Sequence, residues 1–302
     1  MEVIYAHDKS IEKDIDFQLN YFLKSNKNFY RLYITVLSIF KSLHQYSIKV
    51  NSKNSKNFLK DESDIFYLKF SKNLFLKKIS ADKFLKEQID ILEIDIFNKH
   101  PEYLISIWKK IELSELFSDY IKKVNHNFND DKSLVFNLFK KIIALDNKLY
   151  EFYEDTEISW INDLPLVNSL VLTTLKKIDK LSRKSSLIIK IYKNDEDAEF
   201  GVKLINEVIS NSDLLVEEID KFTANWDKDR IAQIDLILLR MCLAEFLFFD
   251  SIPVKVSINE YLELAKEYSS PKSNIFINGV MDAISKQLFK DGRIKKNKRG
   301  LQ

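Results

Sequence analysis

The sequence predicts an all-α protein, and three observations lead to this fold class. Only 4 Gly and 4 Pro occur among the 302 residues, although strands and their tight turns usually need more of both. Apolar residues recur at spacings of three and four almost from the start of the chain, which is the period of one helix face. Apolar residues make up 45% and charged residues 30% of the chain. This composition is typical of a soluble globular protein with a substantial core.

The N-terminal two thirds of the chain predict a series of amphipathic helices. Helical spacing runs from Ile11 to Leu43, and the polar stretch 49–57 is then expected to be a loop. Further amphipathic segments follow, at 89–97, 103–117 and 134–152. Short polar or proline-containing stretches at 99–101, 125–131 and 162–165 are expected to separate helices. Pro101 and Pro165 are each expected in a first helical turn, where a residue without an N–H is tolerated. No period between these segments repeats clearly.

A new helical unit is expected to begin at residue 194. Three acidic residues, 195–197, precede an apolar-periodic run, and acidic groups favour a helix N-terminus. The pattern predicts helices at 195–210, 213–225, 228–249, 256–268 and 271–289. The helix at 228–249 is apolar on most faces, so it is expected to be the central helix of a bundle.

Three local signals accompany the last two helices. The run Ser257-Ile258-Asn259-Glu260 matches a capping box, in which Ser257 would begin a helix. Pro271 is expected in the first turn of the last helix. Gly279 lies inside that helix, where it costs about 1 kcal/mol relative to Ala. Its presence suggests either the close approach of a neighbouring helix or a binding role.

Four blocks in order within residues 195–290 resemble the NusB family of transcription antitermination factors. They are Leu239-Arg240-Met241-Cys242-Leu243-Ala244-Glu245, Ile252-Pro253-Val254-Lys255-Val256-Ser257-Ile258-Asn259-Glu260, Leu262-Glu263-Leu264-Ala265-Lys266 and Phe276-Ile277-Asn278-Gly279-Val280-Met281-Asp282. The resemblance implies two packed helical bundles. We therefore expect an enlarged helical N-terminal bundle at 1–193, a NusB-like bundle at 194–290 and a basic tail at 291–302.

The resemblance also implies a function without catalysis or a cofactor. The expected role is an antitermination adaptor that binds boxA-like single-stranded RNA together with the ribosomal protein NusE, and so acts indirectly on the elongating RNA polymerase complex. Two alternatives stay open. The chain would otherwise be a NusB-like protein-binding scaffold, or the RNA-binding module of a ribosomal RNA modification system. The second alternative requires an α/β cofactor domain, and no Gly-rich strand–turn–helix is visible.

The N-terminus departs from the family pattern. Val3-Ile4-Tyr5-Ala6 resembles the middle of the family's first helix, but no Arg-rich segment precedes it. Because Lys and Arg contacts to phosphate supply much of RNA affinity, the basic segment either lies upstream of Met1 or has been replaced. The tail, which includes Arg293, Lys295 and Lys296, is a candidate replacement; the alternative is a solvated terminus.

The candidate site residues divide into two groups. For RNA, the start of the last helix offers a dipole that favours phosphate, and an aromatic ring there is suited to stacking on an unpaired base. The RNA-binding candidates are Lys272, Ser273, Phe276, Asn278, Arg293, Lys295 and Lys296. By resemblance, the partner-binding candidates are Tyr5, Asp235, Arg240 and Glu245. Each has a structural alternative: Phe276 fits the core stripe, Asn278 a bundle hydrogen bond, and the polar residues of helix 228–249 internal pairs.

Other classes of function receive no support from the sequence. The four His residues lack metal-ligand spacing, and the scattered glycines do not form a phosphate-binding loop. Cys242 is expected to be a small core residue. A single Cys and the lack of a secretory signal predict a cytoplasmic protein. The most apolar stretch, 231–249, is interrupted by charges, so no membrane span is expected.

Overall fold

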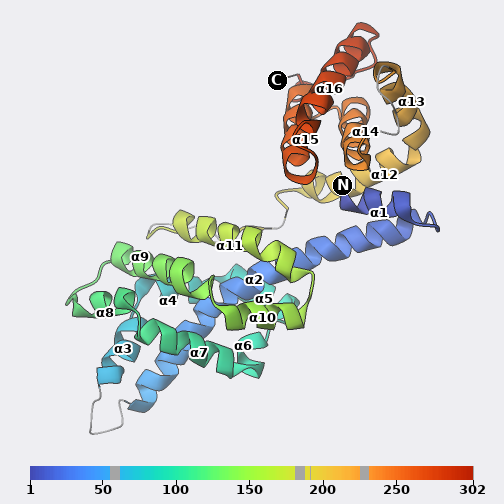
Figure 1. The fold of residues 1–302 in the computed structure, drawn as a ribbon. Helices are drawn as coiled ribbons and strands as arrows, with labels where there is room; N and C mark the ends of the chain where they lie inside the picture. Colours follow the sequence, from blue (N-terminus) through green and yellow to red (C-terminus); the bar gives the residue numbers. More distant parts are fainter. Residues whose placement is uncertain (55–61, 181–187, 191, 225–230, 302) are drawn as a thin grey trace. The chain divides into compact units, whose positions relative to one another are not determined.

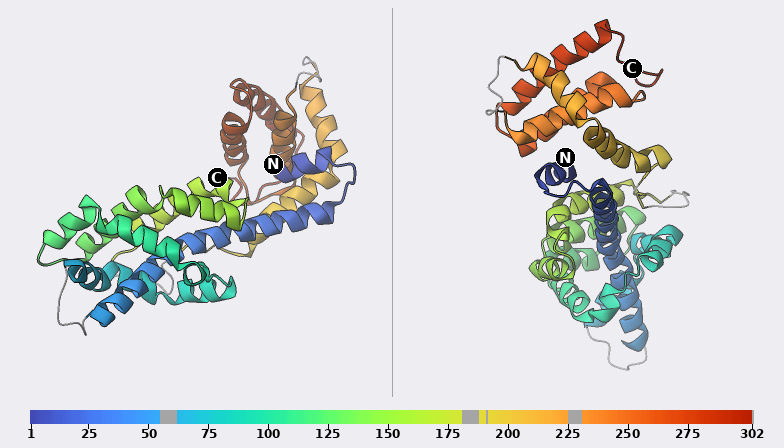
Figure 2. Two further views of the ribbon diagram at one scale, coloured as in Figure 1. Left: turned by 60° about the horizontal axis from the view of Figure 1, so that its bottom comes forward. Right: turned by 90° about the vertical axis from the view of Figure 1, so that its right-hand side faces the viewer.

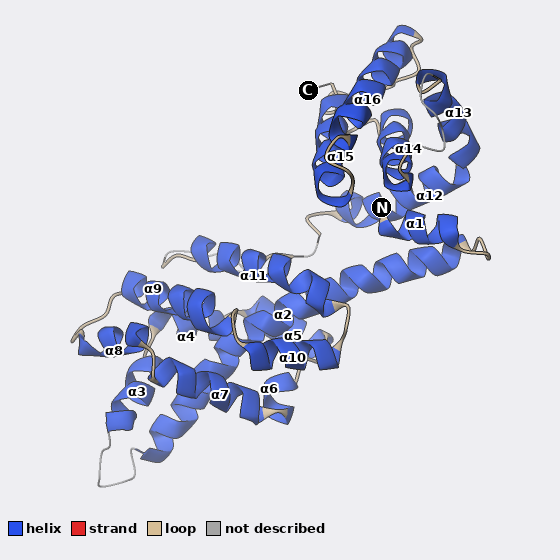
Figure 3. Ribbon diagram, viewed as in Figure 1, coloured by secondary structure: helices blue, strands red, loops and turns tan. Residues whose placement is uncertain are grey.

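The computed structural model describes all residues except 55–61, 181–187, 191, 225–230 and 302. Every regular element in this part of the chain is a helix, as Figure 3 shows, and the predicted all-α class is confirmed. The chain forms two compact units. We call Ser25–Ile191 the middle unit, and Met1–Lys24 with Tyr192–Gln302 the terminal unit. Residues 1–24 thus group with the C-terminal helices, whereas the sequence suggested a single division near residue 193.

The middle unit is built around α2 (Ile15–Asn54), whose residues from Ser25 onward lie among the shorter helices (Figure 1 and Figure 2). Tyr33, Leu37 and Phe40 on α2 are fully buried or nearly so. The other elements are α3 (Glu62–Ser71), α4 (Leu74–Ala81), α5 (Lys83–Ile91), α6 (Ile96–Lys99), α7 (Pro101–Glu112), α8 (Glu115–Lys122), α9 (Phe128–Leu138), the π-helical turn η1 (Phe139–Ile143), α10 (Asn147–Thr156) and α11 (Trp160–Lys177).

Aromatic residues fill much of the middle unit's core. Trp108 stacks on Tyr67 with ring centroids 4.8 Å apart and meets Phe70 edge-on at the same distance. Such pairs add to the stabilisation from burial. The buried carboxylate of Asp131 accepts hydrogen bonds from the Tyr120 hydroxyl and the Leu74 amide, both at 2.6 Å. It thereby ties α9 to α8 and to the start of α4.

The terminal unit is a bundle around α14 (Gln233–Phe248), shown in Figure 1. The helix is apolar on nearly every face and contacts each of its neighbours, as expected for the predicted central helix. These neighbours are α1 (Glu2–Lys9), α12 (Asp195–Ser210), α13 (Ser212–Phe222), α15 (Val254–Tyr268) and α16 (Ser273–Lys290). Ile4 on α1 is fully buried in this core, which explains why the N-terminal helix belongs to this unit.

Two stretches that were predicted to interrupt helices lie wholly or partly inside helices. Residues 162–165 do not separate segments, because α11 begins at Trp160 and runs through Pro165. The burial of Leu164, Val167 and Val171 on one face accounts for the continuous helix. Pro101, in contrast, is the first residue of α7, as predicted. Residues 49–54 of the expected loop continue α2, and 55–57 lie outside the described residues.

The predicted capping box is also wrong. Helix α15 begins at Val254 after the N-cap Pro253, so Ser257 lies in the helix rather than at its start. Its hydroxyl donates to Glu245 Oε2 on α14 at 2.5 Å. Pro271 likewise precedes α16 instead of lying in its first turn. Local patterns predicted the two helices but misplaced their starts, because tertiary partners decide what these side chains bind.

Candidate functional site

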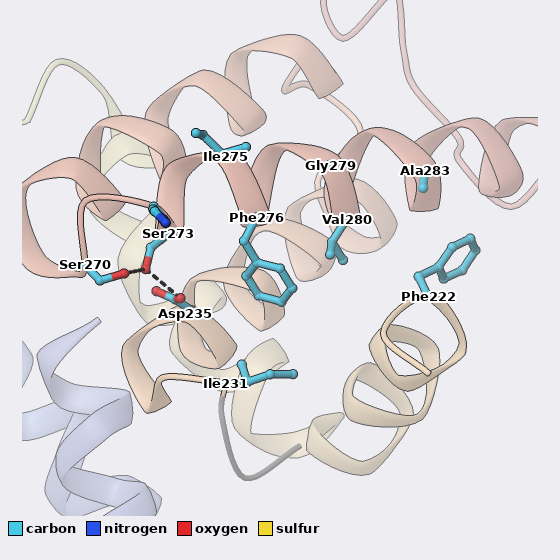
Figure 4. Close-up of a pocket in the computed structure, with 11 residues that line it drawn as sticks. Phe222, Ile231, Asp235, Ser270, Ser273, Ile275, Phe276, Gly279, Val280 and Ala283 are labelled. Atoms are coloured by element: carbon cyan, nitrogen blue, oxygen red, sulfur yellow. Dashed lines mark hydrogen bonds between the residues drawn. The ribbon is translucent and has the colours of Figure 1, made fainter. Parts of the chain in front are cut away.

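A groove of about 590 Å³ lies in the terminal unit where α16 begins. Figure 4 shows its walls, which come from α16, the end of α13 and the segment around the start of α14. Most of the lining is apolar, with a few polar groups gathered at one end. The residues that line it are Phe222, Ile231, Asp235, Ser270, Lys272, Ser273, Ile275, Phe276, Gly279, Val280 and Ala283. A mainly apolar concave site with convergent polar groups is typical of a binding site.

The polar end of the groove is held by Asp235. Its buried carboxylate, 5% exposed, accepts from the Ser269 hydroxyl at 2.5 Å and from the Ser273 hydroxyl at 2.7 Å. The Ser270 and Ser273 hydroxyls are 2.8 Å apart (Figure 4). Asp235 also lies in the first turn of α14, where the helix dipole favours a negative charge. This cluster fixes the start of α16 against α14 and so sets the shape of the groove.

Phe276 and Lys272 give the groove its aromatic and cationic groups. The Phe276 side chain is partly buried, packs against the terminal unit's core and lines the groove. Figure 4 shows its ring pointing from α16 toward Ile231. Lys272 is exposed and is the N-cap residue of α16, which has no side-chain hydrogen bond at its cap. The core role and the groove role of Phe276 therefore coexist.

Gly279 faces open space in the groove. A Cβ atom built at this position would meet no heavy atom of the described residues within 4 Å. The expectation that Gly279 allows the close approach of a neighbouring helix is therefore wrong. Asn278, one residue earlier, is exposed and is not among the residues that line the groove.

The basic tail packs onto the terminal unit. Lys296 Nζ donates to the main-chain oxygens of Glu245 at 2.9 Å and Phe249 at 2.6 Å, at the C-terminal end of α14. Arg293 Nη1 lies 2.7 Å from Glu218 Oε2. Burial opposes the ionisation of Glu218, but hydrogen bonds from Arg293 and Lys221 hold its pKa below the usual value. Arg293 and Lys295 are both exposed, and Lys295 is the one of the three tail candidates with no described bond of this kind.

The partner-binding candidates differ sharply in exposure. Tyr5 on α1 is 38% exposed. Arg240 is buried and forms an ion pair with Asp8 at 2.6 Å, which ties α14 to α1. Glu245 is buried and accepts from the hydroxyls of Ser257 and Tyr261. Burial raises the pKa of Glu245, and the two hydrogen bonds and Lys296 offset part of that effect.

Sequence reasoning missed several residues of the groove, of which three form much of its apolar lining. Ile275 is 72% exposed beside Lys272, and Phe222 and Ile231 form the opposite wall. The sequence could have indicated Ile275, because it is an apolar residue of the last helix that lies outside the helix's buried stripe. The other two come from separate segments, so only the fold brings them to the groove.

The described residues contain no other obvious chemical centre. No three His, Cys, Asp or Glu side chains among them come together as a metal site. Cys242 is fully buried, and burial raises the pKa of its thiol well above the ordinary value. None of the helices in the described ranges is long and apolar enough to cross a membrane.

Comparison with known proteins gives a consistent family. A model described as the NusB family matches residues 167–286. The transcription antitermination protein NusB of Salinibacter ruber is 44% identical over 110 residues, which are 35% of this chain and 69% of that protein. The protein of the same name from Natranaerobius thermophilus is 45% identical over 97 residues, 32% of this chain and 70% of the relative. No solved structure matches.

Other relatives are matched over a smaller share of their length. The NusB protein of Chloroherpeton thalassium is 39% identical over 126 residues, but the chain spans only 59% of its length. All of these matches cover less than half of the present chain. Two relatives at 44% and 45% identity are nevertheless matched over more than two thirds of their length, and the chain therefore belongs to the NusB family.

Proposed function

We propose that this chain is a non-enzymatic transcription antitermination adaptor that binds boxA-like single-stranded RNA together with the ribosomal protein NusE. Joint binding would load the partner onto the elongating RNA polymerase complex, with no bond made or broken. Support comes from family membership and from relatives named transcription antitermination protein NusB. The observation that carries the RNA role is the groove at the start of α16, which combines a cation, an aromatic ring and apolar walls.

The groove suits one unpaired nucleotide. Its volume of about 590 Å³ lies within the usual range for ligand pockets. The ring of Phe276 lines this groove, and stacking on an aromatic residue tolerates any base. Lys272 and the N-terminal end of α16 favour a phosphate beside it. The buried Asp235 cluster keeps these groups in position and is given no direct RNA contact.

For the protein partner, Tyr5 is the best contact residue among the candidates. It is exposed on α1, while Arg240 and Glu245 are buried beneath the surface. Arg240 acts through the ion pair to Asp8, three residues after Tyr5, which fixes α1 against α14. Glu245 joins α14 to α15. We therefore assign Arg240 and Glu245 positioning roles at the partner surface.

A protein-only scaffold is the second candidate, and the charge of the terminal unit favours it. This unit carries 19 Lys and Arg against 24 Asp and Glu, a net charge of −5. Negative charge repels phosphate and weakens non-specific RNA binding. Under this reading the chain would bind the ribosomal partner but would have no RNA affinity of its own.

RNA binding measured with and without NusE, across a salt series, tests the adaptor. We expect a partner-dependent gain for boxA-like over scrambled RNA. Phe276→Ala should weaken binding roughly 5- to 150-fold, since loss of one stacked base costs about 1–3 kcal/mol. Lys272→Gln should weaken RNA binding and reduce its salt dependence. Lys290→Gln makes the same charge change at the other end of α16 and should leave both the affinity and its salt dependence unchanged. Partner binding without any RNA affinity would instead establish the scaffold.

The partner surface has its own matched pair of variants. Tyr5→Ala should weaken NusE binding, and the loss should persist without RNA. Tyr21→Ala, at another exposed tyrosine of the terminal unit, should leave it unchanged. If Tyr5→Ala and Tyr21→Ala bound NusE with the same affinity, α1 would be ruled out as the partner surface.

A further inference from the structure

The two units carry net charges of opposite sign. The middle unit has 28 Lys and Arg against 21 Asp and Glu, a net charge of +7, whereas the terminal unit has a net charge of −5. Attraction of RNA depends largely on neutralising its phosphates. If the terminal unit binds RNA, the favourable long-range electrostatics must come from the middle unit.

The positive charge of the middle unit is concentrated on three contacting elements. Residues 65–81, 132–145 and 164–178 contain nine Lys and no Asp or Glu. These stretches include α4, most of α9 with η1, and most of α11. Helix α9 packs against both α4 and α11, so the three acid-free stretches are neighbours in the folded unit.

Two lysines hold this surface together. Lys132 Nζ on α9 donates to the main-chain oxygens of Lys176 at 2.7 Å and Ile178 at 2.6 Å. Lys78 Nζ on α4 donates to the main-chain oxygen of Asp179 at 2.6 Å. Both ammonium groups therefore satisfy carbonyls at the C-terminal end of α11, where a helix favours cations. They have a structural role and bring α4, α9 and α11 to one point.

Lys69 Nζ likewise donates to the main-chain oxygens of Ile121 and Lys123. The other lysines of these stretches have no such structural role. The ammonium of Lys176 lies 5.5 Å from the centre of the partly exposed Phe136 ring, and the others have exposed side chains that form no ion pair with any residue the structure describes. We call the five of these lysines that lie on α4, η1 and α11 the lysine stripe: Lys77, Lys140, Lys141, Lys176 and Lys177. These like charges lie on neighbouring elements without a compensating carboxylate in the same stretches, so a polyanionic partner would neutralise them.

We propose that the lysine stripe is a second RNA-binding surface, which contacts the phosphate backbone without reading the base sequence; this inference rests on the proposed adaptor function. Lysine is depleted at protein–protein interfaces, so an acid-free lysine surface fits a phosphate backbone better than a protein partner. The stripe gives the enlarged part of the chain a role. It compensates for the negative charge of the unit that carries the groove.

The test compares two triple variants of the full chain. Lys77→Gln, Lys140→Gln and Lys177→Gln remove three stripe charges and leave both Lys78 and Lys132 in place. Lys99→Gln, Lys109→Gln and Lys148→Gln remove three exposed charges from α6, α7 and α10 of the same unit. The two variants have the same net charge, so any difference between them reports the position of the charges. Circular dichroism checks that both fold.

We expect the stripe variant to bind every single-stranded RNA more weakly than the control. Loss of three phosphate contacts should reduce the slope of log K against log salt by about 2 and lower the affinity roughly 10- to 100-fold near 0.1 M salt. The preference for boxA-like over scrambled RNA should not change. The control variant should match the unmodified chain.

Three results would contradict the stripe. In the first, the stripe variant binds RNA as tightly as the unmodified chain. In the second, the stripe and control variants lose the same RNA affinity. In the third, the stripe variant loses binding to polyglutamate but keeps its RNA affinity. The last would indicate an acidic protein partner. Failure of the adaptor function itself would look different, because the unmodified chain would then bind boxA-like and scrambled RNA equally with NusE present.

Discussion

At the scale of single residues, Glu245 shows how the terminal unit uses a buried charge. Its carboxylate is 6% exposed and accepts from Tyr261 at 2.6 Å and from Ser257 at 2.5 Å. These hydrogen bonds join α14 to α15. Burial nevertheless dominates and raises the pKa of Glu245, because it penalises the charged form. The residue favours the folded state more when it is protonated.

Glu245→Gln should therefore change how stability depends on pH. A carboxyl whose pKa is raised by folding stabilises the folded state below its unfolded pKa, about 4.3, and loses that contribution as the pH rises through the folded pKa. The variant cannot ionise at this position. We expect the free energy of unfolding of the variant, relative to the unmodified chain, to increase from pH 4 to pH 7 in urea titrations. A constant difference across this range would show that Glu245 does not titrate above its ordinary pKa.

Single residues also show where sequence reasoning stopped. Ser257 and Glu260 have the spacing of a capping box, but the partner of Ser257 is Glu245, twelve residues earlier. Gly279 is unusual inside a helix, and the sequence shows this. The sequence does not show that Gly279 lines a groove whose other wall comes from α13 and α14. Lys272 and Phe276 were predicted from a local signal at the start of the last helix, and both line the groove. The sequence does not reveal a partner that folding brings from another helix.

At the scale of elements, the segment after α16 acts as a cap for α14. Lys296 satisfies two carbonyls at the helix end, and the amide of Asn297 donates to the main-chain oxygen of Asp250 at 3.0 Å. Gly300 comes so close to the same oxygen that a Cβ there would lie 2.1 Å from it. The charge run was predicted to be either an RNA contact or a solvated terminus. The structure shows a third arrangement, in which part of it stabilises the central helix.

Lys296→Ala should consequently destabilise the chain by about 1.5–3 kcal/mol, the usual range for a hydrogen bond with a charged group. Lys295→Ala is the matched control, because its exposed side chain makes no described bond and should change stability by less than about 0.5 kcal/mol. Chemical denaturation of both variants measures the difference. Equal midpoints would mean that the tail does not hold α14.

Elements were predicted best where burial gives a clear period. The five C-terminal helices follow the expected order, and the apolar α14 is central. In the middle unit, Pro165 and its polar neighbours suggested a break that does not exist. A proline early in α11 removes few backbone hydrogen bonds, while the buried stripe continues on both sides. The stronger packing signal decides the helix.

At the scale of the whole molecule, two separate cores divide the chain. One cluster of buried residues lies in the middle unit and another in the terminal unit. The resemblance in the sequence covered only the second, which explains why the function of residues 25–191 had to come from charge and packing. Chains with two cores of this kind often unfold in more than one step.

We expect two thermal transitions that respond to different substitutions. Leu76 in the middle unit and Met281 in the terminal unit are both fully buried. Replacement of either by Ala should cost about 2–5 kcal/mol. For units of this size the corresponding transition should fall by roughly 5 to 15 °C. Differential scanning calorimetry should show Leu76→Ala lowering one transition and Met281→Ala the other. A single transition that both variants lower equally would mean that the two cores unfold as one, which would make the enlarged part of the chain a structural requirement of the NusB-like bundle.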